Sequence, residues 1–82
     1  SFRVDCQDQA EVDYFWDALA AGGQTSQCGW LKDRYGLSWQ IVPTALPRIL
    51  SDTDPVKAGR AMQAMLKMTK LDIAALEAAA AG

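Results

Sequence analysis

The fold is decided by residues 30–43, which read WLKDRYGLSWQIVP. Two apolar segments, 30–32 and 37–42, flank four residues that end in Gly36, and this arrangement is typical of a β-hairpin with a longer loop. Alternation along the second segment places Leu37, Trp39 and Ile41 on one face and Ser38, Gln40 and Val42 on the other. We expect the first face to form the floor beneath a helix, and Pro43 to end the sheet.

The residues before the hairpin predict a strand, a helix and a polar connection. Alternation of apolar and charged residues over 2–6 is typical of a strand with one buried face, which makes Cys6 a small buried apolar group. Asp8 and Glu11 have the spacing of a capping box. One helix face then carries Val12, Phe15, Trp16 and Leu19, and Gly22-Gly23 predicts the stop. Residues 24–29 predict a loop or a short edge strand.

The chain after Pro43 is rich in alanine and predicts helices, so we divide it into a module over 1–43 and a helical tail over 44–82. Thr44 to Leu50 predicts a short helix or turn bounded by Pro43 and Pro47. Asp54-Pro55 and Asp72 predict the N-caps of two further helices, the second over 73–80. For the first of these two we expect an apolar packing stripe of Val56, Met62, Met65, Leu66 and Met68. We expect a solvated basic face of Lys57, Arg60, Lys67 and Lys70.

Composition excludes several classes of function. The 82 residues are 50% apolar and 22% charged, as in one small globular domain. A net charge of −2 argues against nucleic acid as a partner, and no apolar run is long enough to span a membrane. The chain has no histidine, which removes the commonest general base and metal ligand. Two cysteines are too few for a disulfide framework, so we expect a reducing cytoplasm.

The candidate ligand-binding residues are Gln40, Ser38, Trp30 and Cys28. Ser38 and Gln40 belong to the sheet face that points away from the predicted helix. Gln40 is either a satisfied structural amide or a group that orients a ligand. Cys28 as a nucleophile would need a base, and only Lys32 and Arg34 follow nearby, so no catalytic residue is assigned. No metal ligands are assigned, and Gly22-Gly23 lacks the spacing of a nucleotide-binding loop.

Residues 22–43, together with 11–16, 62–68 and 71–77, resemble the PhnB-like proteins, which are often labelled demethylubiquinone methyltransferase-like. These belong to the vicinal oxygen chelate (glyoxalase/bleomycin resistance/dioxygenase) superfamily. The resemblance implies an α+β fold with one βαβββ module, half of a two-module cup, followed by the helical tail. It also implies that the segment over 24–27 supplies the extra strand, that Ser38 and Gln40 face the cup, and that a first module would precede Ser1.

Metal-dependent members of the superfamily present a glutamate ligand where this chain has Gln40. The resemblance therefore implies no metal or other cofactor here, unless a divalent metal takes its ligands from outside this chain. Whether the chain is an enzyme is left open. We expect an uncharacterised cup-forming protein that binds a small hydrophobic or aromatic molecule, with Trp30 and Trp39 near its walls. One alternative is a metal-dependent enzyme completed by a missing module or a partner.

The other alternative is a purely structural dimerisation module. One βαβββ unit leaves a sheet face that it cannot cover by itself, so we expect a homodimer with paired modules. The C-terminal helix would pack on the partner or be exchanged with it. On this view the tryptophans and methionines serve the dimer core alone, since such side chains are enriched at interface cores.

Overall fold

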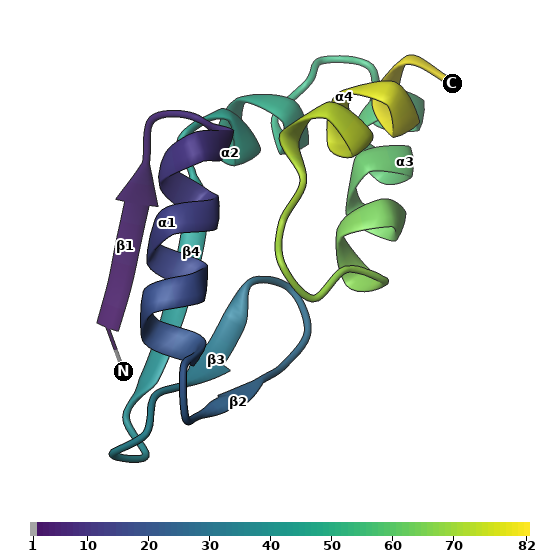
Figure 1. Cartoon of the computed structure of the whole chain (residues 1–82). Helices are drawn as coiled ribbons and strands as arrows, with labels where there is room; N and C mark the ends of the chain where they lie inside the picture. The colour runs from purple at the N-terminus through teal and green to yellow at the C-terminus, as the bar shows by residue number, and fades with distance from the viewer. Residues whose placement is uncertain (1) are drawn as a thin grey trace.

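The computed structural model describes residues 2–82 and has the predicted α+β architecture (Figure 1). A four-stranded sheet carries one helix, and three helices form the tail. The elements are β1 (Phe2–Cys6), α1 (Gln9–Ala20), β2 (Gln24–Thr25), β3 (Trp30–Lys32), β4 (Ser38–Pro43), α2 (Ala45–Leu50), α3 (Pro55–Leu66) and α4 (Ile73–Ala81).

The strands lie in the order β1-β4-β3-β2. The edge strand β1 is parallel to β4, whereas β4, β3 and β2 follow one another antiparallel. Parallel neighbours need a crossover connection, and the segment from α1 to β3 supplies it. This is the βαβββ arrangement. For residues 24–29 the sequence predicted either a loop or a short edge strand, and the structure has a short edge strand at Gln24–Thr25.

Helix α1 is covered by the sheet on one side and starts at the predicted cap. The Asp8 carboxylate accepts a hydrogen bond from Glu11 N at 2.9 Å, while Glu11 Oε1 accepts one from Gln7 N at 2.6 Å. The two bonds satisfy two backbone N–H groups, that of Glu11 in the first turn of α1 and that of Gln7 just before the helix. Beneath the helix lies a core of Cys6, Val12, Trp16, Leu31 and Ile41.

The tail has a second core, made of Val42, Leu46, Ile49, Ala61, Leu71 and Leu76. Asp54 and Asp72 cap α3 and α4 as predicted, accepting hydrogen bonds from Val56 N and Ala75 N. The three tail helices gather at the end of the sheet where β4 finishes (Figure 1). The boundary at residue 43 stays a prediction, and Val42 of β4 contributes to the tail core.

Some expectations for the hairpin and for α2 are wrong. Leu37 does not lie beneath α1, because it belongs to the loop before β4 and is 47% exposed. By contrast, Pro43 does end the sheet as expected, since it is the last residue of β4 and pairs with Cys6. Pro47 lies within the first turn of α2, where the missing N–H has no intrahelical partner to lose.

The expected packing stripe of α3 is also wrong in part. Val56 is 57% exposed and Leu66 is 50% exposed, whereas Ala61 is fully buried. The helix packs through its alanine side, because small side chains let it approach α4 and α2 closely. Met65 and Met68 do contact the tail core, but Lys70 is not part of a solvated face and pairs with Asp13.

Among residues 2–82, none of the helices combines the length and the apolar character needed to cross a bilayer.

Candidate functional site

The two faces of the sheet differ in what covers them. The face toward α1 carries Val4, Cys6, Leu31, Trp39 and Ile41, all within or against the core beneath the helix. Neighbours in register share a face, so the opposite face carries Arg3, Asp5, Gln24, Trp30, Lys32, Ser38, Gln40 and Val42. Of this second set only Val42 is buried. We call this second face, the one that points away from α1, the open face.

The centre of the open face is a row of three side chains from three strands. Gln40 on β4 is paired with Trp30 on β3 and with Arg3 on β1. Trp30 is 37% exposed, a large value for an indole, and Gln40 is partly exposed. An aromatic surface, an amide and a guanidinium therefore lie side by side on the open face, and they offer one flat apolar surface together with hydrogen-bond donors and an acceptor.

Ser38 belongs to the next row of the open face, beside Lys32. Sequence reasoning therefore placed Ser38 and Gln40 on the face away from α1, as the structure does, but it did not place Trp30 beside Gln40 and it missed Arg3. The guanidinium of Arg3 donates to Asp5 Oδ1 at 2.8 Å, and both side chains are exposed. Only the parallel pairing of β1 with β4 brings Arg3 to Gln40, and nothing local in the sequence reports that pairing.

Cys28 lies apart from this row, in the segment that leads into β3. Its backbone has the positive φ of 61°, which is uncommon for a residue other than glycine. The Cys28 amide donates to Met68 O at 2.8 Å, so this segment is attached to the chain between α3 and α4. Cys28 is partly exposed, and it stays a predicted ligand-binding residue.

Trp39, expected near the walls of a cup, points to the α1 side of the sheet instead. Its indole Nε1 donates to Asp33 Oδ2 at 2.9 Å, and its ring lies 5.0 Å from that of Phe2. The hydrogen bond from Trp39, followed by bonds from the Leu37 and Tyr35 amides, lowers the pKa of Asp33. Asp33 thus organises the hairpin loop, and Trp39 is a structural residue.

The other cysteine is part of the core. Cys6 is fully buried below α1, and this burial, with a smaller contribution from Glu11, raises the pKa of its thiol. A thiol whose pKa is raised is a poor nucleophile at neutral pH, so Cys6 behaves as the small apolar group that the strand pattern predicted.

The position that matches the superfamily's glutamate does not fit a metal in this chain. Gln40 supplies a neutral amide, and its neighbour in β1 is the cation Arg3. Within residues 2–82, no three side chains of the Cys, Asp, Glu or His types are grouped so that they could hold a metal ion. Ligands from outside this chain would be needed to complete a metal site.

The predicted site residues line neither of two hollows in the surface. One hollow of about 310 Å³ lies between the end of α1 and the hairpin loop, and its lining includes Leu19, Arg34 and Tyr35. The other, of about 290 Å³, lies in the tail beside Arg48 and Glu77. The predicted site residues therefore belong to the open face and not to either of these two hollows.

A sheet of this order with one helix on one face and an open second face is a glyoxalase-like module, here followed by a helical tail. Comparison with known families agrees with this class. The family model described as 3-demethylubiquinone-9 3-methyltransferase matches residues 1–42, half of the chain, and the chain belongs to this family. None of the curated proteins matches it.

Proposed function

We propose that the open face binds a small aromatic molecule inside a cup formed with a second module. The observation that carries this proposal is the row of Arg3, Gln40 and Trp30, which lies on the part of the sheet face that the helices of residues 2–82 leave unburied. The family description names a methyltransferase that acts on a quinone precursor, and a quinone is a flat ring with polar oxygens. The same chemistry suits the row, so we take aromatic rings bearing oxygen as the ligand class.

Trp30 and Gln40 have separate tasks in this row. The indole of Trp30 provides the flat apolar surface on which a ring stacks. The amide of Gln40 donates to or accepts from one ring oxygen, while Ser38 and Cys28 lie at the margin of the site. This assignment takes Gln40 as the ligand-orienting amide rather than as a satisfied structural one.

A second copy of the chain is the partner that best completes the cup. The open face exposes Trp30 beside polar groups, and α3 exposes Val56, Met62 and Leu66. Exposed apolar side chains of this size are typical of surfaces that associate. We therefore expect a homodimer in which two open faces enclose the ligand.

Titration with 2-naphthol and 4-hydroxybenzoate tests the proposal, using protein labelled with 5-fluorotryptophan and observed by ¹⁹F NMR. The resonance of Trp30, assigned from the Trp30→Phe variant, should move with the titration, whereas those of the core residue Trp16 and of Trp39 should stay. Gln40→Leu should weaken binding by about tenfold, because a hydrogen bond to the ligand oxygen is lost.

Lys32→Ala is the matched control, since Lys32 lies on the same open face but outside the row of Arg3, Gln40 and Trp30. It should leave the affinity within about twofold of the wild-type value. Binding of neither probe at millimolar concentration, or an equal response from all three tryptophans, would contradict the proposal.

A purely structural dimerisation module is the second candidate, and the exposed stripe on α3 favours it. Light scattering separates the two. A dimer that forms in Gln40→Leu as in wild type, with no response to either aromatic probe, would support the structural role. A monomer near the chain mass of 8.9 kDa at micromolar concentration would contradict both.

A further inference from the structure

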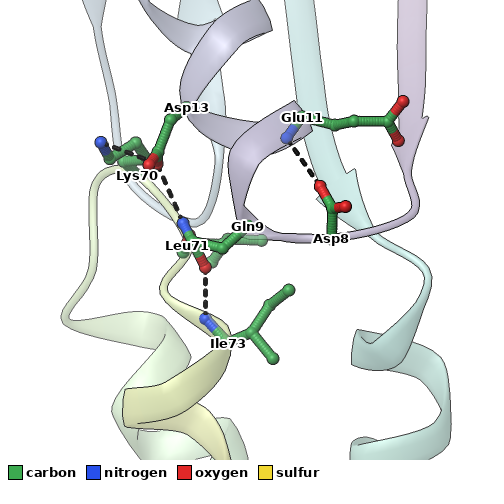
Figure 2. A network of polar contacts seen from close by, with 7 residues as sticks. All are labelled: Asp8, Gln9, Glu11, Asp13, Lys70, Leu71 and Ile73. Carbon is green, nitrogen blue, oxygen red and sulfur yellow. Dashed lines mark hydrogen bonds and ion pairs between the residues drawn. The ribbon is translucent and has the colours of Figure 1, made fainter.

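The segment 67–72, which links α3 to α4, passes between α1 and the segment that leads into β3. On one side Gln9 of α1 holds it: Gln9 Nε2 donates to Leu71 O at 3.1 Å, and Gln9 Oε1 accepts from Ile73 N at 2.8 Å (Figure 2). The same Nε2 donates to Asp13 Oδ1 at 3.0 Å, and Asp13 pairs with Lys70 at 3.0 Å. One glutamine side chain therefore satisfies the backbone groups on both sides of Asp72, the carbonyl of Leu71 and the amide of Ile73.

On its other side the linker holds residues 28 and 29. Cys28 N donates to Met68 O and Gly29 N donates to Thr69 O, each at 2.8 Å. Gly29 O in turn accepts from Ile41 N of β4 at 2.8 Å, directly before Trp30 enters β3. Gly29 has a φ of +81°, and a Cβ there would lie 3.0 Å from Leu71 Cδ1 and 2.8 Å from Ile41 O. No residue larger than glycine fits between the linker and β4.

These contacts form a continuous connection from α1 to the open face. Gln9 fixes the linker, the linker fixes the backbone of residues 28 and 29, and that backbone sets where β3 begins. Trp30 is the next residue, and its pairing with Gln40 depends on that starting point. The tail otherwise makes few contacts with the sheet, since its helices pack mainly on one another.

We propose that Gln9 is a positioning residue for the ligand face, because it fixes the linker between α3 and α4 against residues 28 and 29 and so holds Trp30 in register with Gln40. The proposal rests on the function proposed for the open face. Gln9 does not touch a ligand, as it lies on α1, on the other side of the sheet. The tail is then a part of the site rather than an appendage to it.

Amide hydrogen exchange and ¹⁹F NMR of 5-fluorotryptophan in the Gln9→Ala and Gln9→Glu variants test the proposal. At pH 7 we expect the amides of Cys28 and Gly29 to exchange about tenfold faster than in wild type, because loss of the Gln9 bonds frees the linker. The Trp30 resonance should move toward its position in the unfolded chain. That of Trp16 should not, because Trp16 is held by the core under α1.

The Gln9→Glu variant adds a readout in pH that a general loss of packing would not produce. The introduced carboxylate cannot donate to Leu71 O and repels Asp13, whereas its protonated form has one O–H that can donate to Leu71 O, one of the two bonds that the amide donates. Its ordinary pKa is about 4.3, and the charged groups next to it are Asp13, which bonds the native Gln9, and Lys70, which pairs with Asp13. The protection factors of Cys28 and Gly29 in this variant, corrected for the intrinsic exchange rate at each pH, should therefore be below the wild-type values at pH 7 and return toward them at pH 4.

Gln7→Glu is the matched control, because it adds the same charge two residues away on an exposed side chain. It should leave both amides and the Trp30 resonance as in wild type. If Gln9→Ala does not fold, the pH dependence of exchange in Gln9→Glu tests the proposal by itself. Far-ultraviolet circular dichroism then records the folded fraction at each pH. Unchanged exchange at Cys28 and Gly29 with folded Gln9 variants would overturn the proposal.

The same samples separate this proposal from the proposed function. If Trp30 moves in the Gln9 variants but 2-naphthol binds to no form of the protein, the positioning is real and the ligand assignment is wrong. If 2-naphthol binds to wild type and to the Gln9 variants equally, the ligand face stands and Gln9 has no part in it.

Discussion

The two faces of the sheet are built from neighbouring residues of the same strands, yet one face is buried and most of the other is exposed. Leu31 is almost fully buried under α1, while Trp30 beside it in β3 is exposed on the open face. Along β4, Ile41 is buried with α1 and Gln40 is left partly exposed. One face therefore stabilises the module, and the other is available for a partner or a ligand. Position in the alternation, rather than residue type, decides which role a side chain has.

The largest expected effect comes from comparing a tryptophan on each side of the sheet. Trp16→Ala should lower the free energy of unfolding by about 4 kcal/mol, because a side chain only 7% exposed leaves a cavity in the core. Trp30→Ala should lower it by about half as much, about 2 kcal/mol, since its side chain is 37% exposed and leaves less apolar area to lose. Urea unfolding followed by far-ultraviolet circular dichroism measures both. Equal losses would show that the open face is covered in solution.

A second test compares two glycines at opposite ends of the sheet. Gly29 and Gly36 have nearly equal positive φ values, 81° and 83°, but only Gly29 lies against other atoms. Gly36→Ala should lower the free energy of unfolding by about 1 kcal/mol, from the backbone conformation alone. Gly29→Ala should lower it by about 2 kcal/mol or more, because the Cβ also meets Ile41 O and Leu71.

These two variants also locate the junction with the tail. Only Gly29→Ala should speed exchange of the Cys28 amide, since that amide is bonded to Met68 O. Thermal melts of the two proteins provide the comparison of stability. Indistinguishable melting temperatures would mean that the linker between α3 and α4 adapts to the added methyl group.

The smallest effect concerns Asp33, which joins the α1 face to the hairpin loop. Its pKa is lowered in the folded protein, first by the hydrogen bond from Trp39. The stability that this carboxylate contributes is therefore present above its ordinary value of 3.8 and is lost as the pH falls through the lower folded pKa. The free energy of unfolding of Asp33→Asn should fall less steeply than that of wild type between pH 4 and pH 2.

Asp17→Asn serves as the control for this titration, because Asp17 is exposed on α1 and far from the hairpin loop in sequence. It should retain the wild-type slope below pH 4. Denaturant titrations at a series of pH values give the slopes, and parallel slopes for wild type and Asp33→Asn would refute the role assigned to the Trp39 bond.

Much of the fold could be predicted because its signals are local. The capping box at Asp8, the proline after Asp54 and the alternation around Gln40 each depend on residues a few positions apart. The errors arise where distant packing decides. Leu37 was expected in the core from its apolar side chain, and Leu66 from its helical spacing, yet the elements that would cover them lie elsewhere.

The candidate site divides in the same way. The position of Ser38 and Gln40 on the face away from α1 was predicted from strand alternation, and the resemblance to the PhnB-like proteins implied the same face. Arg3 and Gln9 were missed, since each acts on residues more than thirty positions away. A charged residue in an exposed strand and a glutamine in a first helical turn carry no signal of such partners.

By itself the sequence determined the elements of this protein and the face on which each strand residue lies, because backbone geometry repeats over two or about four residues. Family membership also follows from the sequence, through residues 1–42. Only the tertiary structure decided that β1 pairs with β4, that α3 packs through its alanines, and that the linker from α3 to α4 holds residues 28 and 29. Those choices depend on which distant surfaces fit together, and the energy of that fit is spread over contacts that no short stretch of sequence contains.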